Sequence, residues 1–306
     1  MKKILPSLFL FSIIMFPVKG FCSILHVPAT YSSIQQGIDA SVDGDIVLVE
    51  PGTYYENLYL NGKNIILCSN YFTTGNPGFI SNTIIDGSNS GRVITIDLGE
   101  NSSCQVIGFT IQHGNSSSES GMFYGGGILI LDSSPLIRNC IIKNNSSPTE
   151  GGGGGLAIIG FGSSAKVLNC TIQNNTAGGA GGGVYMGDCT ADAEIVNCII
   201  SGNTNTNDND WNGGGGGVNL VHTGKLVNCL ITNNSAPNSP VGGGGVYCDW
   251  GDYYGNQNIY IIGCTITDNT ALNWGGTSNV INGGECQNCI IWGNTDNSGN
   301  PSNFDG

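Results

Sequence analysis

The sequence contains little positive charge. Lys and Arg together supply nine of the 306 residues, against 22 Asp and Glu, so the formal net charge is −13. Proteins that bind nucleic acid need a basic stripe to neutralise phosphates, and this composition therefore excludes nucleic acid as a partner. Charged residues of both signs make up 10% of the chain but hydrophobic residues 39%, which is enough to bury a core and excludes a disordered polar tract.

Long apolar runs are absent after the N-terminus. The run Ile4–Pro17 is too short for a comfortable bilayer crossing, and it follows Lys2 and Lys3 and precedes a small residue, Gly20. These are the parts of a secretory signal peptide. We therefore expect residues 1–20 to be a signal peptide and the mature chain to have no transmembrane segment and to be secreted or displayed on the cell surface.

Helix-forming patterns are also missing from most of the chain. It contains 50 Gly and 37 Asn, both of which are poor in helix interiors, and its repeats show no period of 3.6 residues. This excludes a helical solenoid. The glycines come in clusters without a strict period of three, which excludes collagen.

What the chain has instead is a repeat anchored mainly on cysteine. The residues around each anchor are alike, as in Val-Leu-Asn-Cys170-Thr-Ile-Gln-Asn-Asn, and successive anchors are 31, 30, 28, 31, 35 and 25 residues apart. A period of this size predicts a solenoid. The anchors are Phe109, Cys140, Cys170, Cys198, Cys229, Cys264 and Cys289.

Four columns of the repeat indicate how a coil is built. The columns three residues before the anchor and two after it are apolar, so we expect both to point inward. Two other columns are mostly Asn. Because Asn tolerates left-handed backbone and its amide can bond to the equivalent Asn of the next coil, each Asn column marks a corner. These asparagines are Asn139, Asn169, Asn197, Asn228 and Asn288 before the anchor, and Asn145, Asn175, Asn203, Asn234, Asn269 and Asn294 after it.

Glycine clusters precede the anchors from Cys140 onward. Each of the first five is followed by a short strand, such as Val184-Tyr-Met, whose first and third residues are apolar and whose middle residue varies, as an outward position should. The order strand, corner, strand, corner, strand, glycine turn describes one coil of a parallel β-helix with three short strands. We interpret the repeated cysteines as a ladder of small buried hydrophobes, although the sequence leaves open whether some of them pair.

The start of the mature chain differs from the repeats. Thr30–Ser41 predicts a short helix, with a capping box from Ser32 and Gln35, that covers the open end of the first coil. We assign the N-terminal cap helix and the first coils to residues 24–90 and the β-helix repeats to residues 91–306. We see no polar cap after the last coil and therefore expect a chain truncated at its C-terminus.

Two parts of the sequence resemble known families. Tyr31–Leu67 carries Ile-Gln-Gln-Gly-Ile-Asp-Ala, then Gly-Asp, then Pro-Gly-Thr-Tyr-Tyr-Glu-Asn, and resembles the opening of pectinesterase-type and related β-helix proteins. The later Gly-Gly-Gly-[Ile/Val] and Cys-x-Ile-x-x-Asn elements resemble repeats of polymorphic outer-membrane proteins and bacterial β-helix adhesins. The resemblance implies an all-β, right-handed single-stranded parallel β-helix of the pectin-lyase-like superfamily, in a bacterial extracellular or outer-membrane protein.

Catalytic motifs of that superfamily are not evident. The pectinesterase motifs Val-Asp-Phe and Gln-Asp-Thr are missing from the sequence, and the Asn294-Thr295 part of a polygalacturonase-like Asn-Thr-Asp match belongs to the repeat. A pectate-lyase-like reaction needs Ca²⁺ held by carboxylates and a base. Arg138 is a candidate base, but we favour an outward Arg at a tolerant corner. The catalytic residues therefore stay unassigned.

Aromatic side chains near the glycine turns are the main binding candidates. Flat rings beside Asp and Asn suit stacking on sugars, whereas the alternative is that the rings pack over the glycine turns. The candidate glycan face consists of Tyr124, Tyr185, Trp211, Tyr247, Trp250 and Trp274. Candidate Ca²⁺ ligands are Asp208, Asp210, Asp249 and Asp252. We expect His26, His113 and His222 to be ordinary surface or loop residues, too far apart to form a metal set.

The sequence thus favours a secreted or cell-surface β-helix protein that works as a binding or adhesin-type module toward a polysaccharide or cell-surface glycan. The alternative is a polysaccharide lyase or glycoside hydrolase that acts on uronate polysaccharides. Ca²⁺ is the one cofactor that the sequence suggests.

Overall fold

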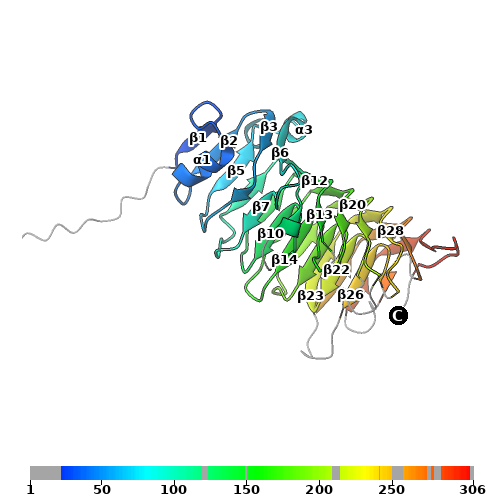
Figure 1. Ribbon diagram of the computed structural model, residues 1–306. Coiled ribbons are helices and arrows are strands. Elements are labelled where there is room, and N and C mark those ends of the chain that lie inside the picture. Colours follow the sequence, from blue (N-terminus) through cyan, green and yellow to red (C-terminus); the bar gives the residue numbers. More distant parts are fainter. Residues whose placement is uncertain are drawn as a thin grey trace, which may run out of the picture.

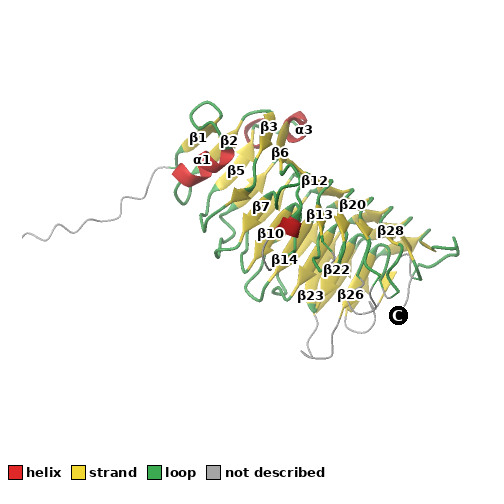
Figure 2. Cartoon of the chain, in the orientation of Figure 1, coloured by secondary structure: helices red, strands yellow, loops and turns green. Residues whose placement is uncertain are grey.

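The computed structural model describes residues 22–118, 123–148, 150–208, 214–240, 242–249, 258–273, 277–278 and 284–303. In these residues the chain winds into a solenoid whose strands pair in parallel with those of the previous and next coils (Figure 1). Figure 2 shows strands along the length of the solenoid and the α-helices near its N-terminal end. This confirms the predicted right-handed parallel β-helix.

Three long sheets, which we call A, B and C, run along the solenoid, as the predicted three-strand coil requires. Sheet A contains β1 (Ile24–Val27), β2 (Ile46–Val49), β5 (Ile66–Ser69), β8 (Gln105–Ile107), β11 (Leu136–Arg138), β15 (Lys166–Leu168), β19 (Glu194–Val196), β23 (Thr223–Val227), β27 (Asn258–Ile262) and β31 (Gly284–Gln287). Sheet B contains β3 (Gly52–Tyr55), β6 (Thr83–Asp86), β9 (Thr110–Gln112), β12 (Ile141–Lys143), β16 (Thr171–Gln173), β20 (Ile199–Ser201), β24 (Leu230–Thr232), β28 (Thr265–Thr267) and β32 (Ile290–Trp292).

Sheet C carries the strands that follow the glycine clusters, and a fourth sheet, D, adds a short side to six coils. Sheet C contains β4 (Leu58–Tyr59), β7 (Ile94–Ile96), β10 (Ile128–Leu131), β14 (Leu156–Ile159), β18 (Val184–Gly187), β22 (Val218–Val221), β26 (Val246–Asp249) and β30 (Thr277–Ser278). Sheet D contains β13 (Ser146–Ser147), β17 (Thr176–Ala177), β21 (Thr204–Asn205), β25 (Ser235–Ala236), β29 (Thr270–Ala271) and β33 (Thr295–Asp296).

The core consists of the columns that the repeat predicts to point inward. Ile137 pairs with Val106 and Val167, and Ile142 pairs with its equivalents in the neighbouring coils, so each apolar column stacks on itself. These side chains are fully buried. Burial of about 25 cal/mol per Å² of apolar surface makes these columns the main stabilising contribution of each coil.

The Asn column five residues after the anchor forms a buried hydrogen-bonded ladder. The backbone N–H and the Nδ2 of Asn175 both donate to Oδ1 of Asn203 at 3.0 Å, and Asn175 Nδ2 also donates to the carbonyl of Ile142 at 3.1 Å. The same bonds recur in each coil. The ladder runs through Asn145, Asn175, Asn203, Asn234, Asn269 and Asn294.

The other Asn column forms the corner between sheets A and B. Asn139 has a φ of 55°, and Asn169, Asn197, Asn228 and Asn288 have nearly the same value. This left-handed backbone is the conformation for which Asn was predicted there. The second left-handed corner lies one residue before the buried ladder, at Asn144 and its equivalents, so the prediction of a left-handed corner at the ladder column itself is wrong by one residue.

A polar side chain closes the last rung of the ladder. Oδ1 of Asn303 accepts hydrogen bonds from the backbone N–H of Asn294 at 3.0 Å and from its Nδ2 at 3.3 Å. In the other coils, Oδ1 of the ladder Asn in the next coil accepts these two bonds. Ser302 and Asn303 thus fold back onto the ladder, and the expected truncation at the C-terminus stays a prediction.

The anchor cysteines form the predicted ladder of buried thiols. The amide of Cys140 donates to Sγ of Cys170 at 3.4 Å, and the Cys140 thiol donates to the carbonyl of Arg138 at 3.4 Å. In the same way, the amide of Cys264 donates to Sγ of Cys289 at 3.4 Å, and the Cys289 thiol donates to the carbonyl of Gln287 at 3.3 Å. The cysteines of the described residues are free thiols.

Buried thiols should not react in the native protein. Burial raises the pKa of Cys68 and Cys104 to about 12, so both stay protonated at neutral and mildly alkaline pH. We expect iodoacetamide at about pH 8 to label the exposed Cys22 but neither buried thiol, because the thiolate is the nucleophile. Mass spectrometry of the labelled peptides measures this. Full labelling in urea is the control, and native labelling of Cys104 would contradict the burial of this thiol.

The glycine clusters lie over the outer face of sheet C. A Cβ on Gly152 would lie 2.8 Å from Cδ2 of Tyr185, and one on Gly214 would lie 2.7 Å from Nδ2 of Asn219. The middle residues of the strands therefore point outward, as predicted, but are covered. Asn219 is 3% and Tyr247 9% exposed. The close approach of two backbones explains why these segments are glycine.

The N-terminal end is covered by the predicted helix, which is shorter than Thr30–Ser41. It is α1 (Ile34–Ala40), and it lies against β1, β2 and β4. Two further short helices, α2 (Tyr71–Thr74) and α3 (Gly78–Asn82), lie beside sheets A and B, and a 3₁₀ turn, η1, spans Ser116–Ser118. The buried residues of α1 are Ile34, Gly37 and Ile38.

The cap of α1 differs from the predicted capping box. Its N-cap is Ser33, whose Oγ accepts from the amide of Gln36 at 3.2 Å, rather than Ser32. The carboxylate of Glu56 accepts from the first two amides of the helix, that of Ile34 at 2.8 Å and that of Gln35 at 2.9 Å. Glu56 thus accepts from two helix amides that have no partner within the helix.

Candidate functional site

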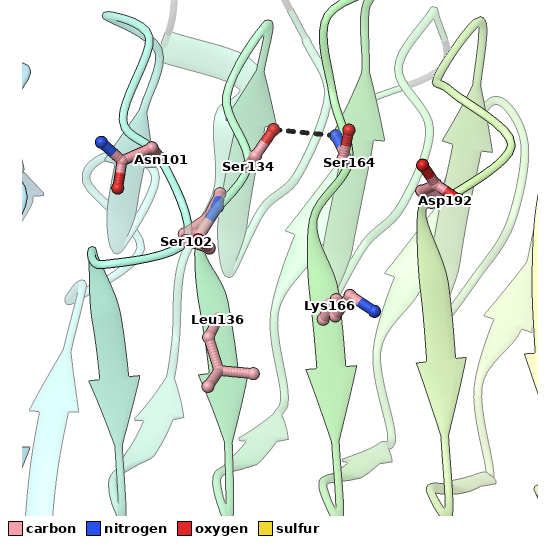
Figure 3. Close-up of a pocket in the computed structure, with 8 residues that line it drawn as sticks. Asn101, Ser102, Ser134, Leu136, Ser164, Lys166 and Asp192 are labelled. Carbon is pink, nitrogen blue, oxygen red and sulfur yellow. Dashed lines mark hydrogen bonds between the residues drawn. The ribbon is translucent and has the colours of Figure 1, made fainter.

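A shallow groove of about 420 Å³ crosses four successive coils where the turns after sheet C enter sheet A (Figure 3). We call it the lateral groove. Figure 3 shows Asn101, Ser134, Ser164 and Asp192 in a row across four adjacent turns. Because adjacent strands lie about 4.8 Å apart, this row spans about 14 Å. The lining residues are Asn101, Ser102, Ser134, Pro135, Leu136, Ser164, Lys166 and Asp192.

The row is held by hydrogen bonds between turns. The amide of Ser164 donates to Oγ of Ser134 at 3.0 Å, and Oγ of Ser164 lies 3.0 Å from Oγ1 of Thr190 in the next coil. The Ser134 amide donates to the carbonyl of Glu100 at 2.6 Å. The groove is thus built on turns that are fixed to one another and to the sheet.

A buried carboxylate supports the first of these turns. Glu100 is 1% exposed, and its Oε2 accepts from the Leu98 amide at 3.0 Å and from Oγ of Ser133 at 2.9 Å. Its Oε1 accepts from the amide of Gly62 at 2.9 Å. Buried carboxylates persist where hydrogen bonds satisfy their oxygens, so Glu100 ties three coils together beside the groove.

The lower part of the groove is the outer face of sheet A. Leu136, Lys166 and Glu194 are neighbours in register on β11, β15 and β19. Nζ of Lys166 forms an ion pair with Oε1 of Glu194 at 2.8 Å, and the Lys166 side chain is half exposed. The groove therefore offers hydroxyl, amide and carboxylate groups along its upper row and an apolar surface at Leu136 and Pro135.

The predicted aromatic face is described for three of its six residues. The rings of Tyr124 and Tyr185 are in contact, with centroids 4.9 Å apart and an interplanar angle of 49°. Tyr185 is half buried, and Tyr247 lies almost buried on the covered side of sheet C. These rings therefore pack over the glycine segments. Trp211, Trp250 and Trp274 lie outside the described residues.

The predicted Ca²⁺ ligands are not seen to converge. Asp208 is exposed, and Asp249 ends β26. Asp210 and Asp252 lie outside the described residues. Among the residues that the structure describes, no three His, Cys, Asp or Glu side chains gather in a set that could hold a metal ion.

Arg138 lies away from the lateral groove, with its guanidinium carbon 6.0 Å from the centre of the Phe72 ring. This cation–π contact joins sheet A to α2. It agrees with the interpretation of Arg138 as an outward residue of sheet A.

Two of the histidines make contacts that the sequence did not predict. His113 Nδ1 lies 2.8 Å from Oδ2 of Asp86, and His222 Nδ1 lies 2.7 Å from Oδ1 of Asp188. Burial alone would raise the pKa of Asp86, but hydrogen bonds, among them those from Gln112 and His113, outweigh it and lower that pKa. Both histidines have left-handed backbone, so each acts as a corner residue that links two coils.

The lateral groove itself was missed at the sequence level. Its signal in the sequence is a Ser-Ser pair that recurs in three coils and ends two residues before β8, β11 and β15. The second residues of these pairs are Ser103, Ser134 and Ser164. The spacings between these serines, 31 and 30 residues, match the repeat. Asp192 occupies the same position in the next coil. A search of the turn columns would have found it.

Comparison with solved structures finds proteins of similar fold. The chain is similar to pectate lyase Pel9A, with 14% identity and a TM-score of 0.53, over 91% of this chain and 79% of that one. This likeness shows a shared right-handed parallel β-helix fold.

Two other solved structures are less similar. A rice weevil pectin methyl esterase has 14% identity and a TM-score of 0.43, over 90% of this chain and 89% of that one. The Aspergillus niger pectin methylesterase has 14% identity and a TM-score of 0.40, over 88% and 85%. Comparison with protein-family models gives no match, and neither does comparison with curated proteins.

The described helices are short. None of them has the length and apolar character that a bilayer crossing needs. The predicted signal peptide, residues 1–20, lies outside the described residues.

Proposed function

We propose that this protein is an exported binding module that holds a polysaccharide or cell-surface glycan along the lateral groove. The observation that supports this most is the row of hydrogen-bonding side chains from four successive coils. An extended polymer that runs parallel to the solenoid axis presents a hydroxyl-bearing unit again and again, and the groove presents a polar group in every coil. Ligand sites of this kind combine apolar surface with a few placed polar groups.

The rigidity of the groove also favours binding. Its polar atoms lie on turns that hydrogen-bond to one another, as Ser134 and Ser164 do, and the adjoining strands are paired on both sides. A preformed site loses little conformational entropy when a ligand is bound. The apolar surface of Leu136 suits the C–H face of a sugar ring.

The test is binding of the mature chain to a panel of immobilised polysaccharides, combined with ultraviolet absorbance of unsaturated products from polygalacturonate and alginate, with and without Ca²⁺. We expect binding without turnover. The alternative, a lyase or hydrolase on uronate polysaccharides, requires turnover: a rise in absorbance for a lyase, or new reducing ends for a hydrolase. Either form of turnover would contradict a pure binding module.

A matched pair of variants localises the binding. Leu136→Glu replaces the apolar floor of the groove with a carboxylate beside Lys166, and Leu230→Glu makes the same change on the outer face of sheet B. Loss of one apolar contact should weaken binding about ten-fold, or about 1.4 kcal/mol, in the first variant. The second should bind as the wild type does. Equal effects in both would place the glycan elsewhere.

A further inference from the structure

The charges around the lateral groove indicate which polysaccharides it accepts. Lys166 is the basic residue among those that line it, and its ammonium group is already paired with Glu194 at 2.8 Å. Asp192 lines the groove with an exposed carboxylate. The three side chains together carry a net charge of −1.

The surroundings add more negative charge. Asp132 lies in the turn that leads to Ser134, and its Oδ1 accepts from the Gly162 amide at 3.4 Å. Asp43 accepts from the amide of Asn64 at 2.9 Å. Oδ1 of Asn64 accepts in turn from the amide of Asn101, which lines the groove.

One more cation lies near the groove. Lys225 is next to Glu194 in the register, one coil beyond the groove, and its Nζ lies 5.7 Å from the centre of the Tyr260 ring. Five carboxylates, those of Asp43, Glu100, Asp132, Asp192 and Glu194, therefore stand against the ammonium groups of Lys166 and Lys225. The formal charge of the whole chain, −13, has the same sign.

We propose that the lateral groove takes an uncharged, hydroxyl-rich polysaccharide in preference to a uronate polymer, an inference that rests on the proposed binding function. A polyuronate carries a carboxylate on each unit, and in this groove it would meet carboxylates and a lysine that is already neutralised. Like charges at contact distance are unfavourable even when partly screened by salt. An uncharged polymer pays no such cost and can use the hydroxyl, amide and carboxylate acceptors of the upper row.

The first test compares polymers that differ in charge alone. Polygalacturonate and alginate are each compared with the same polymer after its carboxylates have been reduced to primary alcohols, beside neutral mannan, xylan and glucan. We expect the reduced polymers to bind about ten-fold more tightly than their parents at low ionic strength, and the difference to shrink at high salt. Tighter binding of the parent polyuronates would overturn the inference while it supported the proposed function. Binding of no polymer would overturn the proposed function itself.

The second test changes the charge of the groove. The double variant Asp192→Asn/Glu194→Gln leaves Lys166 unpaired and should bind polygalacturonate about ten-fold more tightly than the wild type at low salt. Asp268→Asn/Glu285→Gln is the control, because it removes the same charge outside the groove. Asp268 occupies a corner column in which Asn144, Asn174 and Asn233 have the same left-handed backbone, so Asn is tolerated there. An equal gain in both variants, or a gain in neither, would contradict the role of the groove charges.

Discussion

Asn203→Leu should lower the free energy of unfolding by about 2–6 kcal/mol, because it leaves buried hydrogen-bonding groups without partners. The Asn203 side chain is fully buried in the middle of the ladder. Its Oδ1 accepts from the backbone and the side chain of Asn175, and its Nδ2 donates to the carbonyl of Ile172 at 3.0 Å and to Oδ1 of Asn234 at 2.9 Å. Leucine offers none of these bonds.

A loss of this size is a large part of the stability of an ordinary domain, about 5–15 kcal/mol. Urea unfolding followed by circular dichroism measures this loss. Hydrogen exchange should show that the coils next to residue 203 open first. Asn197→Gly is the control. Asn197 is exposed and has a φ of 54°, which glycine adopts readily, so this variant should be nearly as stable as the wild type. Equal stability of both variants would show that the ladder contributes little.

Gly154→Ala should destabilise the protein by about 3 kcal/mol, since the added methyl group has no space. A Cβ at Gly154 would overlap the backbone carbonyl oxygens of Thr176 and Gly182. Both are main-chain atoms of paired segments, so neither can move aside as a flexible side chain would. The cost is therefore steric rather than conformational.

Gly162→Ala is the matched control for this substitution. The nearest atom to a Cβ at Gly162 is 3.7 Å away, an ordinary contact, and thermal unfolding of this variant should differ little from that of the wild type. If Gly154→Ala melted at the same temperature as Gly162→Ala, the glycine segments would not be packed against sheet D and against one another as described.

The repeat made most of the fold predictable. Aligning the chain on its anchors assigned the inward columns, and the type of residue then gave the conformation, as at Asn139, where a left-handed corner favours Asn. The buried Asn ladder followed from the same alignment, because identical amides in adjacent coils are within reach of each other. Periodicity works well here since every coil solves the same packing problem.

The site was harder to predict because it depends on the turns, whose lengths vary between coils. The turn between sheets C and A spans residues 132–135 in one coil but shrinks to His222 in another. Side chains such as Asp86 and His113 are 27 residues apart and meet only once the register is known. Of the candidate aromatic residues, Tyr124, Tyr185 and Tyr247 are described, and they pack beside the glycine segments. That these segments cover sheet C, and so bury Tyr247, is a property of tertiary packing that composition does not reveal.

The most direct test of the account is a hydrogen–deuterium exchange footprint of the mature chain with the neutral polysaccharide that binds most tightly in the panel. The account predicts slower exchange in the turns at residues 101–104, 132–136, 162–166 and 190–194, with sheet B unchanged at residues 171–173 and 199–201. Protection that was confined to sheet B, or to the glycine segments over sheet C, would contradict binding in the lateral groove.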